Sequence, residues 1–261
     1  MIDSCTHITC QTPTHVCQTL KTLYGNNAPG YLTLVLLSSC NIASSTCKIQ
    51  SMRAAILTLV LSVHLALSLQ AQPPLKQWTI AEKNSIMRSL DSTLETLHVL
   101  ISPLSEKQFF YRADSNSWSV NDVMEHLGVI EEGYVREFWW ALSQPEIPAS
   151  YQDSTNGGDE KAIAYATDPT KGHARGTNLP IKRYCDKQTC WRVFAAAREL
   201  SKDFFVRNNT VNMRAYYVFR KNASGKRDVR DLHQQALWML SHCIRHSEQI
   251  RRIFNEPGFP K

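Results

Sequence analysis

The chain of 261 residues, 43% of them hydrophobic, is long enough for one or two domains with a packed core. Its formal net charge of +6 is small for this length, and its basic residues form no stripe with interleaved aromatic residues. These features argue against a nucleic-acid partner, and none is expected.

The segment "MRAAILTLVLSVHLALSLQAQPP" predicts a secretory signal peptide over residues 52–71. Met52 and Arg53 give a short positive start, an apolar run follows, and the small residue Ala71 precedes a polar, proline-containing stretch. The protein is therefore expected to be exported, to a periplasm or to the medium. An uncleaved membrane anchor is the alternative, because the apolar run approaches the shortest length that spans a bilayer.

Residues 1–51, which precede this segment, hold five of the eight cysteines and no sustained helical period. Their cysteine spacings match no paired C-x-x-C arrangement, so a zinc cluster is not expected there. We expect either a start assigned too far upstream, with Met52 the true first residue, or a disordered leader.

Two helices are predicted after the signal segment. In the first, Thr79 stands three residues before Glu82, the pattern of a capping box, and Ser119 and Asp122 repeat this pattern in the second, "SVNDVMEHLGVIEEGYVREFWWAL". Apolar residues recur in both at the spacing of a helix packed on a core. They are Ile86, Leu90, Leu94, Leu97 and Ile101 in the first helix, and Val123, Leu127, Ile130 and Tyr134 in the second.

Residues 143–189 contain several prolines and glycines and little periodicity, which predicts a long connection that carries the chain from one end of a bundle to the other. A third helix is predicted from Trp191, with Phe194 and Ala197 facing inward. Just before it, Cys185 and Cys190 could form a short-loop disulfide in an oxidising compartment.

The stretch "AYYVFRKNASGKRD" predicts a short extended piece with a turn, and Asp228 is expected to cap a fourth helix. The inward stripe of this helix is Leu232, Ala236, Met239, Cys243, Ile250 and Ile253, with His233 projecting elsewhere. Four amphipathic helices with one long crossover connection between the second and third predict an all-α four-helix bundle over residues 78–260.

Three histidines fall on inward faces. His242 and His246 lie four residues apart, one turn apart on one helix face, and His126 stands between Val123 and Ile130 of the second helix. Three buried imidazoles without partners would leave polar atoms unsatisfied at about 1–3 kcal/mol each. A divalent ion would satisfy one nitrogen of each ring.

The sequence therefore predicts a metal site at His126, His242 and His246, with a coordination position left for water or substrate, as in catalytic metal sites. Zinc or nickel is expected, although imidazole also suits copper and iron. Each ring needs an orienting partner for its other nitrogen, and the sequence does not choose among Glu125, Glu132 and Glu248, the first of which helical geometry turns away from His126.

The motif "WSVNDVMEHL", followed by "WMLSHCIRHSEQIRRI", resembles the DinB-like superfamily, which includes the YfiT-type metal-dependent proteins. The resemblance spans residues 78–260 and implies a four-helix bundle with one histidine on the second helix and an H-x-x-x-H pair on the last, here His126, His242 and His246. It also implies a choice of activities. Some relatives are transferases or isomerases that use low-molecular-weight thiols such as bacillithiol or mycothiol, and others have been called metal-dependent hydrolases.

The first functional hypothesis is an exported enzyme that uses the metal for hydrolysis or thiol-dependent transfer on a small molecule. Arg175, Lys182 and Arg183 of the long connection are candidate anion contacts, and further catalytic residues are unassigned. Export argues against the thiol-dependent role, because such cosubstrates are scarce outside the cytoplasm.

The alternative is a non-catalytic metal- or ligand-binding bundle. It could form a homodimer through Phe138, Trp139 and Trp140. A membrane partner beyond the signal anchor is not expected, because the sequence has no other long apolar run.

Overall fold

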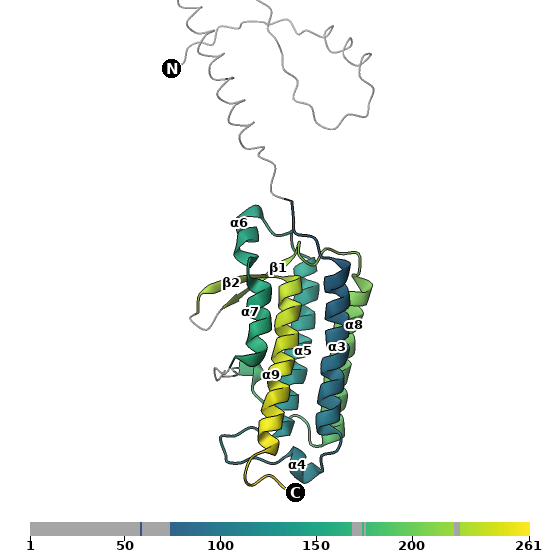
Figure 1. Ribbon diagram of the computed structural model, residues 1–261, viewed down its shortest axis with the longest axis vertical. Coiled ribbons are helices and arrows are strands. Elements are labelled where there is room, and N and C mark those ends of the chain that lie inside the picture. The colour runs from purple at the N-terminus through teal and green to yellow at the C-terminus, as the bar shows by residue number, and fades with distance from the viewer. Residues whose placement is uncertain (1–57, 59–73, 169–173, 175, 222–224) are drawn as a thin grey trace, which may run out of the picture. The chain divides into compact units, whose positions relative to one another are not determined.

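The computed structural model describes residues 58, 74–168, 174, 176–221 and 225–261 (Figure 1). Apart from residue 58, these belong to one compact unit, Ala71–Lys261. The N-terminal extension, nearly all of the predicted signal segment, and Arg175 lie outside the described residues, so the predicted domain boundaries stay predictions. Within the described part, no helix combines the length and the apolar character needed to cross a membrane.

The predicted all-α bundle is confirmed. Four long helices of the described residues lie side by side in Figure 1: α3 (Ile80–Ile101), α5 (Val120–Leu142), α8 (Lys187–Arg207) and α9 (Leu232–Phe254). A short helix, α4 (Glu106–Phe109), follows α3. The strands β1 (Tyr217–Lys221) and β2 (Arg227–Asp231) form an antiparallel hairpin between α8 and α9.

The helix starts follow from side chains that accept hydrogen bonds from otherwise unpaired N–H groups. Both predicted capping boxes are present, at α3 and at α5. The predicted starts of the last two helices are wrong. Helix α8 begins at Lys187, because Asp186 caps it through the N–H of Thr189, and α9 begins after Asp231, because residues 227–231 pair with β1 and leave Asp228 inside a strand.

Side-chain contacts fix the directions of the helices. Along α5 and α8, Asn121 meets Cys190, Glu131 meets Arg198 and Phe138 meets Phe204, so residue numbers rise together and the two helices are parallel. Helix α9 is antiparallel to α5, since His126 meets His242 whereas Glu137, later in α5, meets Gln235, earlier in α9. The connection between α5 and α8 therefore returns the chain to the end of the bundle at which α5 begins.

This connection has more regular structure than its sequence predicts. It contains α6 (Ala149–Gln152), η1 (Asp153–Thr155), α7 (Gly158–Ala164), η2 (Tyr165–Thr167) and η3 (Gly176–Asn178). Helix α7 lies against α9, where a Cβ on Gly158 would come within 2.4–2.6 Å of the amide of Gln234. Such short helices leave no sustained period in the sequence, which is why the prediction failed.

The core consists of two apolar clusters separated by a buried polar layer. The guanidinium of Arg198 donates to the carboxylate of Glu131 (Nε to Oε1, 2.6 Å), and the hydroxyl of Ser201 donates to the same oxygen at 2.7 Å. On α3 this layer falls between Leu90 of one cluster and Leu97 of the other. A fully buried ion pair thus ties α5 to α8 at the middle of the bundle.

Two further predictions concern a disulfide and a homodimer. Within the described residues Cys185, Cys190 and Cys243 are all free, so the predicted disulfide is wrong: Cys185 is exposed, whereas Cys190 lies buried against α5. Phe138 is in the core, whereas Trp139 and Trp140 are 45% and 59% exposed, so a homodimer through these rings stays a prediction.

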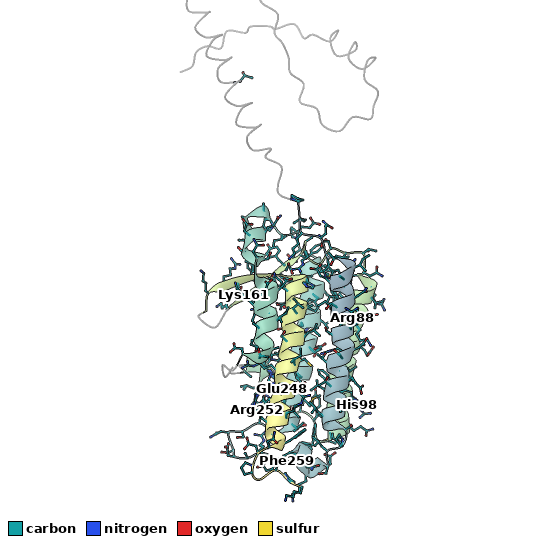
Figure 2. The ribbon with its side chains drawn as sticks, in the orientation of Figure 1. Arg88, His98, Lys161, Glu248, Arg252 and Phe259 are labelled. Carbon is teal, nitrogen blue, oxygen red and sulfur yellow. The ribbon has the colours of Figure 1, made fainter. Side chains whose placement is uncertain are left out.

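At the end of the bundle where α4 lies, the C-terminal residues close the core. Phe259 lies at this end of the bundle (Figure 2). Its ring packs on the rings of Tyr111 and Phe254, with centroids 5.5 and 5.4 Å away. The side-chain amide of Gln108 donates to the carbonyl of Pro260 at 3.1 Å. The tail is therefore part of the folded unit.

Candidate metal centre

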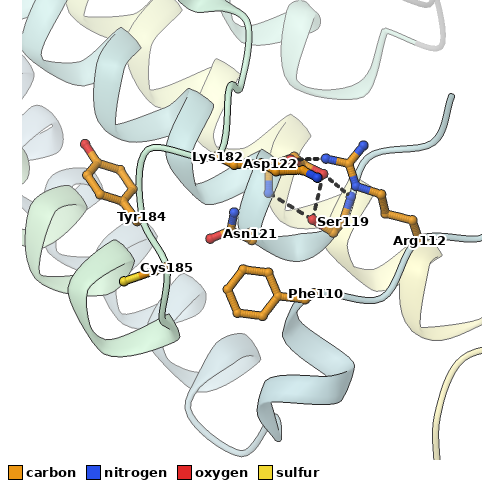
Figure 3. A pocket seen from close by; sticks show the side chains of 8 residues that line it. All are labelled: Phe110, Arg112, Ser119, Asn121, Asp122, Lys182, Tyr184 and Cys185. Atoms are coloured by element: carbon orange, nitrogen blue, oxygen red, sulfur yellow. Dashed lines mark hydrogen bonds and ion pairs between the residues drawn. The ribbon is translucent and has the colours of Figure 1, made fainter. Parts of the chain in front are cut away.

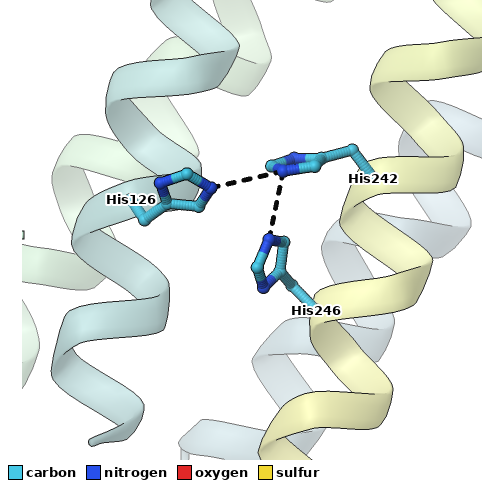
Figure 4. A group of neighbouring side chains, drawn as sticks. All are labelled: His126, His242 and His246. Carbon is cyan, nitrogen blue, oxygen red and sulfur yellow. Dashed lines mark hydrogen bonds between the residues drawn. The ribbon is translucent and has the colours of Figure 1, made fainter. Parts of the chain in front are cut away.

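Helices α5 and α9 bring three imidazole rings together, His126 from the first and His242 and His246 from the second (Figure 4). The Nε2 atom of His242 lies 3.2 Å from Nε2 of His126 and 3.0 Å from Nε2 of His246. One ligand atom from each ring lies within 4.8 Å of the other two. These are the three residues proposed from the sequence; that they bind a metal stays a prediction.

Hydrogen bonds to the outer nitrogens fix the protonation of two rings. Nδ1 of His126 lies 2.7 Å from the carbonyl oxygen of Asn178, and Nδ1 of His246 lies 2.7 Å from Oε1 of Gln249. An oxygen of either kind can only accept, so each Nδ1 carries the proton and each Nε2 presents a lone pair. Both lone pairs face His242.

The arrangement fits a divalent cation. A proton on Nε2 of His242 could be donated to only one of its two neighbours, whereas a cation satisfies all three nitrogens at once. Zinc–nitrogen bonds of about 2.0–2.1 Å with tetrahedral angles place nitrogen ligands about 3.3 Å apart. The observed separations of 3.0 and 3.2 Å need only small outward movements to reach that value.

Burial keeps all three rings in the form that binds a metal. It is the largest cause of the lowered pKa of His126, His242 and His246, and the mutual proximity of the rings lowers the pKa of the latter two further. The pKa of His246 falls to about 3. The rings are therefore neutral near pH 7, so a metal does not have to compete with imidazolium cations.

None of the three glutamates considered as orienting partners bonds to these rings within the described residues. Glu132 lies near Arg136 and Glu248 pairs with Arg251, both at the surface. Glu125 is fully buried and holds another part of the chain. Gln249 could have been found from its position three residues after His246, whereas a backbone carbonyl such as that of Asn178 leaves no mark in a sequence.

Glu125 fastens the end of the long connection, residues 176–185, which we call the covering segment, onto α5. Its carboxylate accepts hydrogen bonds from the backbone N–H groups of Ile181 (2.7 Å) and Arg183 (3.0 Å) and from the Arg183 guanidinium. The guanidinium also donates to the carbonyls of Thr177 and Leu179. Arg183, predicted as an anion contact, is thus engaged in holding the segment that presents the Asn178 carbonyl to His126.

Aromatic rings form the walls around the three histidines. The ring of Trp118 lies 5.1 Å from that of His126, and the ring of Tyr165 lies parallel to that of His242 at 6.3 Å. His126 and His246 are buried, whereas His242 keeps partial exposure. Burial raises the pKa of Tyr165, so its hydroxyl stays protonated. Sequence reasoning missed Tyr165 because it belongs to the long connection.

A second cluster, Glu82, Asp159 and His233, has ligand-like spacing but does not suit a metal. The Trp78 indole N–H donates to Nδ1 of His233 at 3.0 Å, so the proton of that neutral ring is on Nε2, the atom that faces Asp159. Arg214 already pairs with both carboxylates at 2.6 Å. His233, expected outside the inward arc of its helix, is nevertheless buried, and the Trp78 indole donates to it.

Comparisons with known proteins found one family match and one similar solved structure. Residues 89–250 match the DinB superfamily. Among solved structures, YfiT from Bacillus subtilis, described as a probable metal-dependent hydrolase with an unusual four-helix bundle topology, is similar at a TM-score of 0.46 and 13% identity. That likeness covers 72% of this chain and 94% of YfiT. No curated protein matches the chain.

Proposed function

Because the chain belongs to the DinB superfamily and brings three neutral imidazoles within reach of one cation, we propose that it binds a single divalent metal ion through His126, His242 and His246. The observation that supports this most directly is that the lone pairs of His126 and His246 both face Nε2 of His242. Zinc or nickel is the proposed ion, because imidazole nitrogen suits both.

We propose further that the protein is a metal-dependent hydrolase of a small molecule. An ion held by three neutral protein ligands, with a coordination position free, supplies Lewis acidity and an activated nucleophile near pH 7. The chain's own contribution is to shape and orient. Trp118 and Tyr165 form flat walls for planar or apolar parts of a substrate, and the protonated Tyr165 hydroxyl can donate to a substrate oxygen.

Hydrolysis is preferred to thiol-dependent transfer because of the proposed location. If residues 52–71 direct export, water is always present at the site whereas low-molecular-weight thiols are scarce. Sequencing the N-terminus of the protein recovered from its native host tests this. A chain starting at Gln72 outside the cytoplasm supports the proposal, and an uncleaved chain inside the cytoplasm restores the transferase as the stronger candidate.

Activity is tested with the purified chain loaded with zinc or nickel. A panel of aryl esters and amides, and 1-chloro-2,4-dinitrobenzene with cysteine as thiol, separates hydrolysis from transfer. His242→Ala is expected to abolish turnover, and His98→Ala is the matched control, because His98 is exposed on α3 and lies outside the site. Stoichiometric metal without metal-dependent turnover would instead support the alternative, a non-catalytic metal-binding bundle.

A further inference from the structure

A pocket of about 400 Å³ lies at the N-terminal end of α5, between that helix, the residues after α4 and the covering segment (Figure 3). Phe110, Asn121, Lys182, Tyr184 and Cys185 are among the residues that line it, and none of the three clustered histidines does. Its volume is in the range of pockets that bind small molecules.

Asn121 lacks a hydrogen-bond partner in this pocket. The residue is only 1% exposed, and its Oδ1 has no hydrogen-bond partner among the residues that the structure describes. Its neighbours are satisfied: the hydroxyl of Ser119 donates to Asp122 at 2.6 Å, and Asp122 also accepts from Arg112 at 2.7 Å. A buried acceptor left unpaired costs about 1–3 kcal/mol, so Asn121 points to a missing donor.

Lys182 brings a positive charge to the same pocket. It has a φ of 62°, which is unusual for a residue with a side chain. The backbone N–H groups on either side of it, of Ile181 and Arg183, both donate to Glu125, and these bonds hold Lys182 in that conformation. Among the described residues, no carboxylate pairs with its ammonium, whereas the charge of Arg112 is balanced by Asp122.

The remaining walls are aromatic. Phe110 is 38% exposed and Tyr184 is partly buried, so both rings keep surface available to a planar molecule. We propose that this pocket binds a small aromatic acid. Its carboxylate pairs with Lys182, its hydroxyl or N–H group donates to Oδ1 of Asn121, and its ring packs against Phe110 and Tyr184. This proposal does not depend on the metal or on the hydrolase activity.

Cys185 provides a reporter for occupancy of the pocket. Its thiol is exposed, whereas burial raises the pKa of Cys190 to about 12 and that of Cys243 to about 11, which makes these two unreactive. In the full chain, the rate at which iodoacetamide modifies Cys185 is followed by peptide mass spectrometry. A molecule seated in the pocket should slow this reaction.

The probe is 4-hydroxybenzoate, compared with benzoate, which lacks the donor, and 4-hydroxybenzyl alcohol, which lacks the carboxylate. At saturation, 4-hydroxybenzoate should slow modification of Cys185 at least about fivefold. Each of the other two compounds should need at least about tenfold higher concentration for the same protection. This is the factor expected for one lost hydrogen bond or ion pair to a charged group. No protection by 4-hydroxybenzoate, or equal protection by all three, overturns the proposal. This comparison requires no variant.

Two variants assign the contacts. In Asn121→Leu, 4-hydroxybenzoate and benzoate should protect Cys185 equally. In Lys182→Asn, 4-hydroxybenzoate and 4-hydroxybenzyl alcohol should protect Cys185 equally. Asparagine is chosen at position 182 because it tolerates the positive φ. His242→Ala should leave protection unchanged, which separates this pocket from the metal centre. Circular dichroism checks that both pocket variants are folded. If both folded variants still prefer 4-hydroxybenzoate over the two analogues as strongly as the unmodified chain does, the assignment is contradicted.

Discussion

Nε2 of His126 on α5 lies 3.2 Å from Nε2 of His242 on α9, although 116 positions separate the two residues. The Nδ1–H of His126 donates a hydrogen bond to the Asn178 carbonyl on the other side of the ring, so Nε2 presents its lone pair between the two helices. A cation placed there joins α5 to α9. Metal binding and stability should therefore be linked.

Zinc should raise the melting temperature of the protein. A ligand that binds the folded chain and not the unfolded one at 100 times its dissociation constant adds about 2.7 kcal/mol. His126→Ala should lose this shift, whereas His98→Ala should keep it. Thermal denaturation with zinc or with a chelator measures the effect, and an equal shift in both variants would mean that the ion binds elsewhere.

Gln249 should control metal affinity through His246. Gln249→Ala removes the acceptor that fixes the Nδ1–H of His246, and loss of such an orienting bond costs about 10–100-fold in affinity. Gln249→Glu keeps an acceptor and should retain binding. Competition with a chromogenic chelator gives the affinities. Gln188→Ala on α8 is the matched control and should behave as the unmodified chain does, since Gln188 is exposed.

The buried ion pair should be sensitive to removal of one partner. Glu131→Gln leaves the Arg198 guanidinium buried without its counter-charge, and we expect a loss of about 3–5 kcal/mol in the free energy of unfolding. The double change Glu131→Leu with Arg198→Met should recover most of this loss. Urea denaturation measures both.

Asp203→Asn is the surface control for this ion pair. It breaks an exposed pair with Arg207 and should cost less than about 1 kcal/mol. Equal costs for Asp203→Asn and Glu131→Gln would show that the polar layer in the core is not buried in solution.

His233 should make stability depend on pH. Burial, aided by the charge of Arg214, lowers its pKa to about 4, whereas the unfolded ring has a pKa of about 6.5. The unfolded chain therefore takes up a proton first, so this contribution is complete above about pH 6.5 and is lost as the pH falls towards 4.

His233→Gln removes this contribution and keeps an acceptor for the Trp78 indole. The unfolding free energy of the unmodified chain should fall more steeply than that of the variant as the pH is lowered from about 7 to 4. Urea denaturation at several pH values gives both curves. Parallel curves would mean that His233 titrates normally in the folded protein.

The sequence was most informative where one helix carries the whole signal. The i, i+4 pair of His242 and His246 and the capping residues Thr79 and Ser119 act within a few positions, so spacing alone identified them. The inward position of His126 likewise followed from its apolar neighbours.

Features that depend on distant parts of the chain were not predictable from spacing. Asp228 and Asp231 are equally good caps, and only the pairing of β2 with β1 decides between them. His233 is buried and accepts a hydrogen bond from Trp78, 155 positions earlier. Tyr165 reaches the three-histidine cluster through the short helices of the connection, which leave no period.

X-ray absorption at the zinc edge of the zinc-loaded full chain tests the central proposal most directly, because it distinguishes the ligands of this site from the N-terminal cysteines. We expect three imidazole nitrogens at about 2.0 Å and no sulfur, with zinc bound at this site lost in His242→Ala. Sulfur at about 2.3 Å, or an unchanged spectrum in that variant, would contradict the three-histidine site.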